Sequence, residues 1–131
     1  MNDAPPRLPV RRLGALVLDL VCVLALAVGG KSSHDAGDST WVVLAIGWPF
    51  AVAAVVVHGL LAWRARPPHP VWPAGVAILA ATYLLGMLLR ALSGRGLAPA
   101  FLVVAGLFLT ATMLGWRLVM QLVARRRARA G

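Results

Sequence analysis

The sequence predicts an all-α integral membrane protein, a bundle of four transmembrane helices. Of its 131 residues, 60% are hydrophobic and only 13% are charged, and the mean hydropathy is +0.82. An average soluble domain is about 45–50% apolar and about 25% charged. A soluble domain of this size could not bury so much apolar surface. The composition therefore excludes a soluble enzyme, a secreted module and a disordered tail.

Four apolar runs are long enough to cross a bilayer, whose hydrocarbon core of about 30 Å needs roughly 20 helical residues. They cover residues 13–30, 41–63, 74–92 and 98–124. None of them alternates polar and apolar residues as a strand of a membrane barrel would. We therefore expect a four-helix transmembrane domain over 13–124, preceded by an N-terminal arm at 1–12 and followed by a basic tail at 125–131.

Polar segments separate the runs. A polar loop at 31–40 joins the first two, and a Pro-rich basic connector at 64–73 joins the second to the third. The prolines of that connector stop a helix, because proline lacks the backbone N–H and clashes with the preceding turn. The segment 93–96 turns the chain again, and Pro99 suits the first turn of a fourth helix.

Basic residues flank the runs unequally, which predicts the orientation. One end of the bundle carries nine of them: Arg7, Arg11, Arg12, Arg64, Arg66, Arg125, Arg126, Arg127 and Arg129. The opposite end carries two, Lys31 and Arg95. Because basic flanks stay cytoplasmic, we expect both termini on the cytoplasmic side of a bacterial plasma membrane, where the arginines meet anionic lipid headgroups. The net charge of +9 is thus assigned to membrane topology and not to nucleic-acid binding.

The first run also imitates a secretory signal peptide, with basic residues, an apolar stretch and small residues in order. Asp19 in the middle of that run, and the three runs that follow it, favour a retained helix instead.

Asp19, His58 and Arg117 lie inside the runs, and they form a predicted intramembrane charged cluster. Asp19, His58 and Arg117 all lie five to eight residues from the arginine-rich end of their helices, roughly 10 Å deep at 1.5 Å per residue. A charge at that depth is a functional hypothesis by default. One interpretation is a structural tie between Asp19 and Arg117. Another is a proton or cation site, and a third has Arg117 reaching the headgroups while Asp19 stays protonated.

A second polar group is predicted at the opposite end of the bundle. It comprises Lys31, Ser32, Ser33, His34, Asp35, Arg90 and Arg95. Such a rim could hold a phosphate or a carboxylate, or it could be solvated loop. His34 and Asp35 lack the further ligands that a metal site needs. The single cysteine, Cys22, allows no disulfide framework, and no catalytic residue, metal or cofactor is assigned.

Several of these residues also carry a family resemblance. The motifs are Asp19, Gly-Lys-Ser-Ser-His at 30–34, Trp48-Pro49, Gly86-Met-Leu-Leu-Arg90 with Gly94 and Gly96, and Gly115-Trp116-Arg117. Over about residues 13–119 the chain resembles an uncharacterised actinobacterial membrane family, domain of unknown function 3054. That family usually has arginine where Lys31 stands, so the charge is kept but the planar fork of arginine is lost. The resemblance implies a four-helix membrane protein and no particular activity.

Two classes of function stay open. The first is a non-enzymatic membrane component, an accessory or scaffold subunit that packs against a membrane protein partner or its own copies. The second is a small proton- or cation-coupled transporter with Asp19 as its intramembrane coupling site. A lipid-acting enzyme would need a nucleophile or a metal cluster, and only the outer Ser32, Ser33, His34 and Asp35 group could imitate one.

Overall fold

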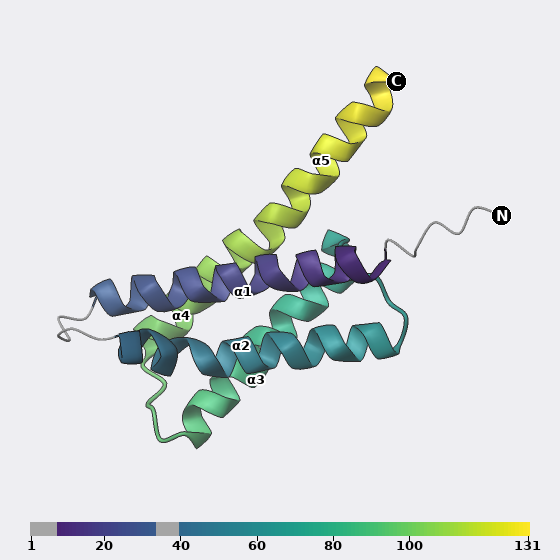
Figure 1. Cartoon of the computed structure of the whole chain (residues 1–131). Helices are drawn as coiled ribbons and strands as arrows, with labels where there is room; N and C mark the ends of the chain where they lie inside the picture. Colours follow the sequence, from purple (N-terminus) through teal and green to yellow (C-terminus); the bar gives the residue numbers. More distant parts are fainter. Residues whose placement is uncertain (1–7, 34–39) are drawn as a thin grey trace.

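The computed structural model describes residues 8–33 and 40–131, and this part of the chain is helical with no strand (Figure 1). Four helical stretches are long and apolar enough to cross a membrane: Val10–Gly30, Thr40–Trp63, Val71–Leu92 and Pro99–Ala130. The predicted fold class, an all-α bundle with four membrane-spanning helices, is confirmed.

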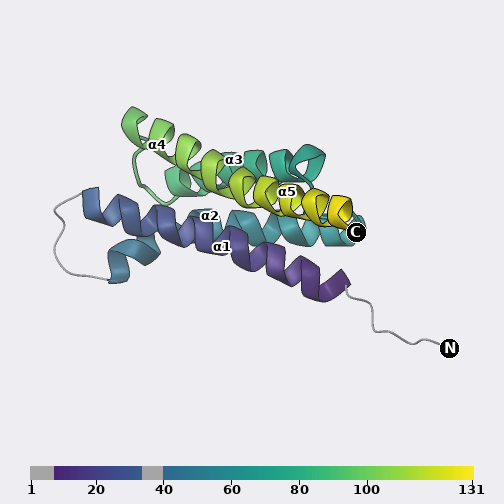
Figure 2. The ribbon, with the colours of Figure 1, turned by 90° about the horizontal axis from the view of Figure 1, so that it is seen from above.

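The first two helices, α1 (Leu8–Ser33) and α2 (Thr40–Trp63), form an antiparallel pair (Figures 1 and 2). Small residues let them approach closely: a Cβ placed on Gly47 would lie 3.3 Å from the Cβ of Ala27. In lipid, where apolar burial alone does not drive association, such close contacts stabilise helix pairs. Helix α2 continues through Pro49, which is fully buried.

The third stretch begins with a π-helical turn, η1 (Val71–Gly75), and continues as α3 (Val76–Leu92). It packs against α2, so that α2 lies between α1 and α3. The largest apolar side chains at the centre are fully buried: Phe50, Ile78, Leu109 and Met113. These come from α2, α3 and the fourth stretch, and α1 completes the core with Cys22, Val23 and Leu26.

The fourth stretch is one long bent helix made of α4 (Pro99–Leu109), a π-helical turn η2 (Thr110–Leu114) and α5 (Gly115–Ala130). Its 32 residues correspond to about 48 Å at 1.5 Å per residue, more than the bilayer core. A π-helical turn inside an α-helix changes its direction, and in Figure 1 the C-terminal half of α5 projects away from the other helices. Val119 and Met120, in the first half of α5, are 58% and 60% exposed, so they face lipid or another protein.

Four helix ends differ from the sequence prediction by three residues or more. Helix α1 continues to Ser33, past the predicted end at 30, and η1 begins at Val71, inside the connector predicted at 64–73. Helix α1 begins at Leu8, within the predicted arm at 1–12, and α5 runs to Ala130, through most of the predicted tail at 125–131. Proline is tolerated in a first helical turn, so Pro9 does not delay the start of α1. Alanine and arginine are strong helix formers, so the Arg/Ala-rich end of the chain extends the helix.

The connector between α2 and η1, residues 64–70, is fastened to the start of α1. Arg12 Nη1 donates a 2.7 Å hydrogen bond to the carbonyl oxygen of Arg66. Pro68 is fully buried, and the amide of Gly75 donates to the carbonyl oxygen of Pro70 at 2.8 Å. The connector therefore folds inward against the bundle.

His69 in this connector gives the fold a pH dependence. Burial of its ring holds the pKa of His69 below the ordinary value of 6.5, and the nearby charges of Arg11 and Arg117 act in the same direction. A hydrogen bond to the backbone of Arg11 opposes them without reversing the shift. The folded state thus keeps His69 neutral at a pH where the unfolded chain binds a proton. The contribution of His69 to the free energy of unfolding is fully present above about pH 6.5 and is lost progressively as the pH falls below that value.

We expect His69→Gln to remove part of that pH dependence. The measurement is the midpoint of unfolding by sodium dodecyl sulfate in mixed micelles, at about pH 7.5 and about pH 5.5, because these values lie on either side of the ordinary histidine pKa of 6.5. The decrease in the unfolding midpoint from the higher to the lower pH should be smaller in His69→Gln than in the wild type. Equal drops would contradict the prediction.

Candidate functional site

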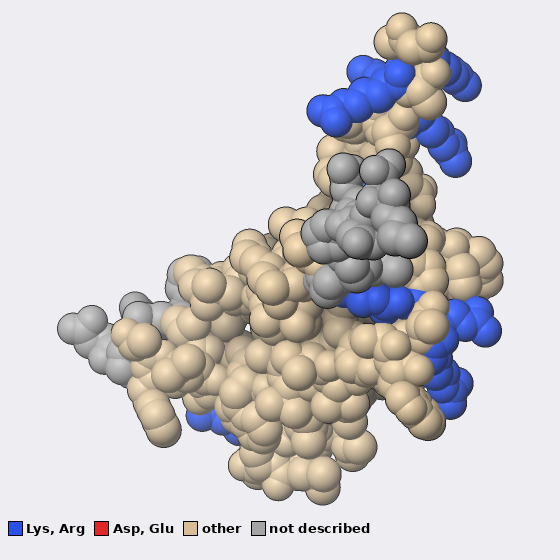
Figure 3. Space-filling model, turned by 45° about the vertical axis from the view of Figure 1, so that its right-hand side comes forward, with Lys and Arg blue, Asp and Glu red and all other residues tan. Residues whose placement is uncertain are grey.

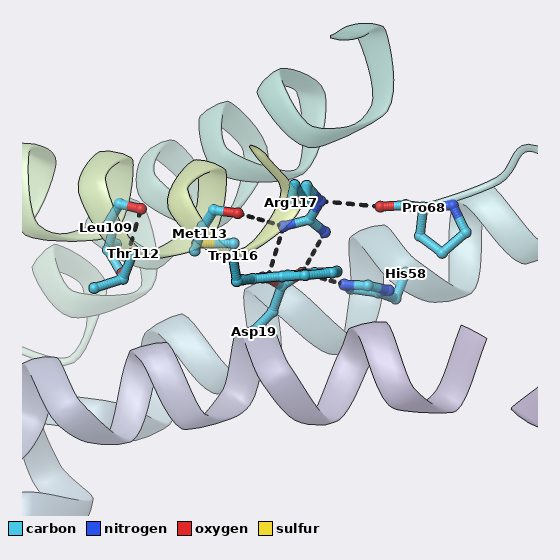
Figure 4. Close-up of polar contacts among 8 residues, drawn as sticks. All are labelled: Asp19, His58, Pro68, Leu109, Thr112, Met113, Trp116 and Arg117. Carbon is cyan, nitrogen blue, oxygen red and sulfur yellow. Dashed lines mark hydrogen bonds and ion pairs between the residues drawn. The ribbon is translucent and has the colours of Figure 1, made fainter. Parts of the chain in front are cut away.

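Asp19 lies on α1 and is fully buried. An ionised carboxylate inside a membrane is expensive unless it is paired and hydrogen-bonded. The structure supplies both kinds of partner, from α2 and from the first turn of α5 (Figure 4).

Arg117 is the main partner of Asp19. Its Nη1 donates to Oδ1 at 2.8 Å and its Nη2 donates to Oδ2 at 2.7 Å, the parallel geometry that makes arginine–carboxylate pairs strong. Nε of Arg117 donates to the carbonyl oxygen of Pro68 at 3.0 Å, and Nη1 donates also to that of Met113 at 2.9 Å. Arg117 is fully buried, so the interpretation in which it reaches the headgroups is wrong.

His58 and Trp116 complete the site. His58 Nε2 lies 2.7 Å from Oδ2 of Asp19, and Trp116 Nε1 donates to Oδ1 at 2.8 Å. The guanidinium carbon of Arg117 also lies 4.3 Å from the centre of the Trp116 ring, within the range of a cation–π interaction. Each oxygen of Asp19 therefore has two polar partners. We call Asp19, His58, Trp116 and Arg117 the Asp19 cluster.

The local sequence explains how Arg117 fits. A Cβ on Gly75 would lie 2.8 Å from Cδ of Arg117 and 2.9 Å from the carbonyl oxygen of Pro70. Any larger residue would push the start of α3 off the guanidinium stem. The turn η2 ends at Leu114, two residues before Trp116, and it contains Met113, whose carbonyl oxygen accepts from Arg117.

The structure thus brings together the three residues of the predicted intramembrane cluster, Asp19, His58 and Arg117. Sequence reasoning missed Trp116 and Pro68 as members of the site. The signals for Trp116 were its adjacency to Arg117 and its place in the Gly115-Trp116-Arg117 motif. A backbone carbonyl such as that of Pro68 leaves no signal in a sequence.

The second predicted group is described only in part. His34 and Asp35 lie outside the described residues, and Lys31, Ser32 and Ser33 form the last turn of α1 with their side chains outside the description. Arg90 packs over the ring of Phe101, with Cζ 4.1 Å from its centre, and its Nε donates to the carbonyl oxygen of Gly96 at 3.3 Å. Arg95 is exposed. In the described part, Arg90 therefore joins α3 to α4 and the loop between them.

We expect Trp116→Phe to destabilise the protein by about 1.5 kcal/mol, since hydrogen bonds to charged groups contribute about that much. The ring of phenylalanine keeps the apolar contact but cannot donate to Asp19. Unfolding should be followed by far-ultraviolet circular dichroism, because the substitution changes tryptophan fluorescence. The matched control is Trp41→Phe, at a residue that is 74% exposed, and it should leave stability unchanged. Equal losses in the two variants would contradict the role of the indole N–H.

The comparisons with known proteins agree with the resemblance drawn from the motifs. No curated protein and no solved structure matches the chain. One family model matches residues 16–120, which include every residue of the Asp19 cluster. The chain belongs to the family described as protein of unknown function, DUF3054.

Proposed function

We propose that the protein is a non-enzymatic, multi-pass component of the bacterial plasma membrane, in which the Asp19 cluster locks α1 to α5. One observation carries the proposal: both oxygens of Asp19 are occupied by protein partners, and the residue is fully buried. A carboxylate that couples transport must exchange its partners for water or substrate during each cycle. A carboxylate held by Arg117, His58 and Trp116 together is suited to a permanent structural contact.

The role of an accessory or scaffold subunit is supported by α5. The apolar residues of α5 beyond Arg117 are exposed, among them Leu118, Val119 and Met120. A second copy of the chain or a membrane protein partner could pack on them. The Asp19–Arg117 pair would hold the base of this helix in a fixed direction.

The proposed topology has both termini in the cytoplasm. It is supported by the eight arginines of the described chain that flank the helices at one end: Arg11, Arg12, Arg64, Arg66, Arg125, Arg126, Arg127 and Arg129. Fluorescent-protein fusions after Gly131 should fluoresce, and alkaline phosphatase fused after Gly94 should be active. The reverse pattern would overturn the topology.

A second candidate is a proton- or cation-coupled transporter using Asp19. It is favoured by the position of His58, which contacts Asp19 and also lines a cavity of about 360 Å³ between α1 and α2. A path for protons would need such an opening.

Proton flux into proteoliposomes under an imposed pH gradient separates the two candidates. A membrane component should give the same flux as empty vesicles, both as wild type and as the Asp19→Asn/Arg117→Gln double variant. A flux above that level, abolished by Asp19→Asn in a variant that stays folded, would overturn the proposal and support the transporter.

A further inference from the structure

The cavity beside His58 has the chemistry of a lipid site. It lies between α1 and α2, with a volume of about 360 Å³, within the range of about 300–1,000 Å³ typical of small-molecule pockets. Most of its wall is apolar, and the lining residues are Arg12, Leu13, Leu16, Val55, His58, Gly59, Ala62 and Pro68. An acyl chain fits such a wall, and a hydrated polar ligand does not.

Arg12 supplies a positive charge to this cavity. Among the described residues its guanidinium donates one hydrogen bond, from Nη1 to the carbonyl oxygen of Arg66. Arginine has five N–H donors in a planar fork that suits a phosphate. The other N–H groups of Arg12 therefore have no acceptor among the described residues, while Nη1 is held by the connector at the wall of the cavity.

The described chain offers no exposed acidic side chain to meet this charge. Its single acidic residue is Asp19, which is buried and bonded to Arg117. Figure 3 shows basic side chains gathered toward the projecting end of the molecule and along one edge below it, with no acidic side chain among the described residues on the face drawn. Anionic lipid headgroups in the adjoining leaflet are the complementary partner.

We propose that the cavity binds one anionic phospholipid, with its phosphate on Arg12 and the upper part of an acyl chain against Leu16 and Val55. The bound lipid also covers His58, whose side chain is 6% exposed and lines this cavity. The lipid thereby excludes water from the one member of the Asp19 cluster that reaches this cavity. With the proposed topology the lipid comes from the cytoplasmic leaflet, and the site itself does not depend on that topology.

Gly59 provides a test that does not remove a charge. A Cβ on Gly59 would meet no atom within 4 Å, so Gly59→Leu should fill the cavity without a clash. Gly14→Leu is the matched control, because Gly14 also has open space within 4 Å and does not line this cavity. Arg12→Gln tests the headgroup contact, with Arg125→Gln on α5 as its control.

The experiment measures retention of phosphatidylglycerol and phosphatidylcholine with the same acyl chains by native mass spectrometry of the full chain released from micelles. The wild type should retain phosphatidylglycerol at least tenfold more tightly. Gly59→Leu and Arg12→Gln should each lose about that factor, and both controls should behave as the wild type.

Three outcomes would overturn the proposal. Gly59→Leu could retain the lipid as the wild type does, or Gly14→Leu could lose it equally. Millimolar inorganic phosphate could displace it, which would reveal a site for the free anion. Should Arg12→Gln fail to fold, Gly59→Leu still decides the question. None of these results depends on proton flux or on the topology fusions, so the inference and the proposed function fail separately.

Discussion

Replacing Arg117 with glutamine should destabilise the protein by about 3–5 kcal/mol, the range found when one partner of a buried ion pair is removed. The variant leaves Asp19 inside the bundle with His58 and Trp116 but without a counter-charge. It also removes donors from the carbonyl oxygens of Pro68 and Met113. The measurement is the free energy of unfolding by sodium dodecyl sulfate in mixed micelles.

The matched double variant separates a pair from two unrelated residues. Asp19→Asn should also destabilise, and Asp19→Asn/Arg117→Gln should be more stable than the sum of the two single losses predicts. Arg126→Gln on the exposed end of α5 should change nothing. Additive losses would show that Asp19 and Arg117 do not act together and would remove the basis of the proposed lock.

Gly86→Ala should produce the second large loss, about 3 kcal/mol, at the upper end of the range for overpacked cores. A Cβ on Gly86 would lie 2.8 Å from Cε1 and 3.0 Å from Cγ of Phe50. The ring of Phe50 is fully buried, so it cannot turn aside, and α2 and α3 must separate. Thermal unfolding followed by circular dichroism measures the effect.

The partner substitution checks that explanation. Combining Gly86→Ala with Phe50→Leu should cost less than the two single losses added together, because the smaller side chain leaves room for the new methyl group. Gly14→Ala, at an exposed glycine with open space around it, should leave stability unchanged or raise it. Stability of Gly86→Ala equal to that of the wild type would contradict the contact between α2 and α3.

The membrane-spanning helices could be predicted because the apolar runs are long and are separated by prolines and polar loops. The meeting of Asp19, His58 and Arg117 could also be predicted, since counting residues from the arginine-rich helix ends placed all three at one depth. However, the depth of a residue in the membrane does not determine the direction in which its side chain points around the helix axis. Whether Arg117 turned inward or toward the headgroups depended on its neighbours in three dimensions.

Those neighbours could not be read from residue types. The acceptor on Pro68 is a backbone carbonyl, and the space for the Arg117 stem is created by the missing side chain of Gly75. The π-helical turn at Thr110–Leu114 carries no distinctive residue pattern. The helix ends at Leu8 and Ala130 were missed because polar flanks were equated with the end of a helix, although alanine and arginine favour its continuation.

The distance along the chain between Asp19 and Arg117 has a consequence for biosynthesis. The two residues are 98 positions apart, in the first and the last membrane-spanning stretch, so about 5–20 s of translation separate them at about 5–20 residues per second. During that interval the first helix holds its carboxylate in or beside the bilayer without its arginine. The ion pair therefore forms last, and a chain that stops before α5 keeps an uncompensated acid in its first helix. Because the ribosome makes Arg117 after Asp19, the Asp19 carboxylate gains its counter-charge only when the last helix of the bundle has been made.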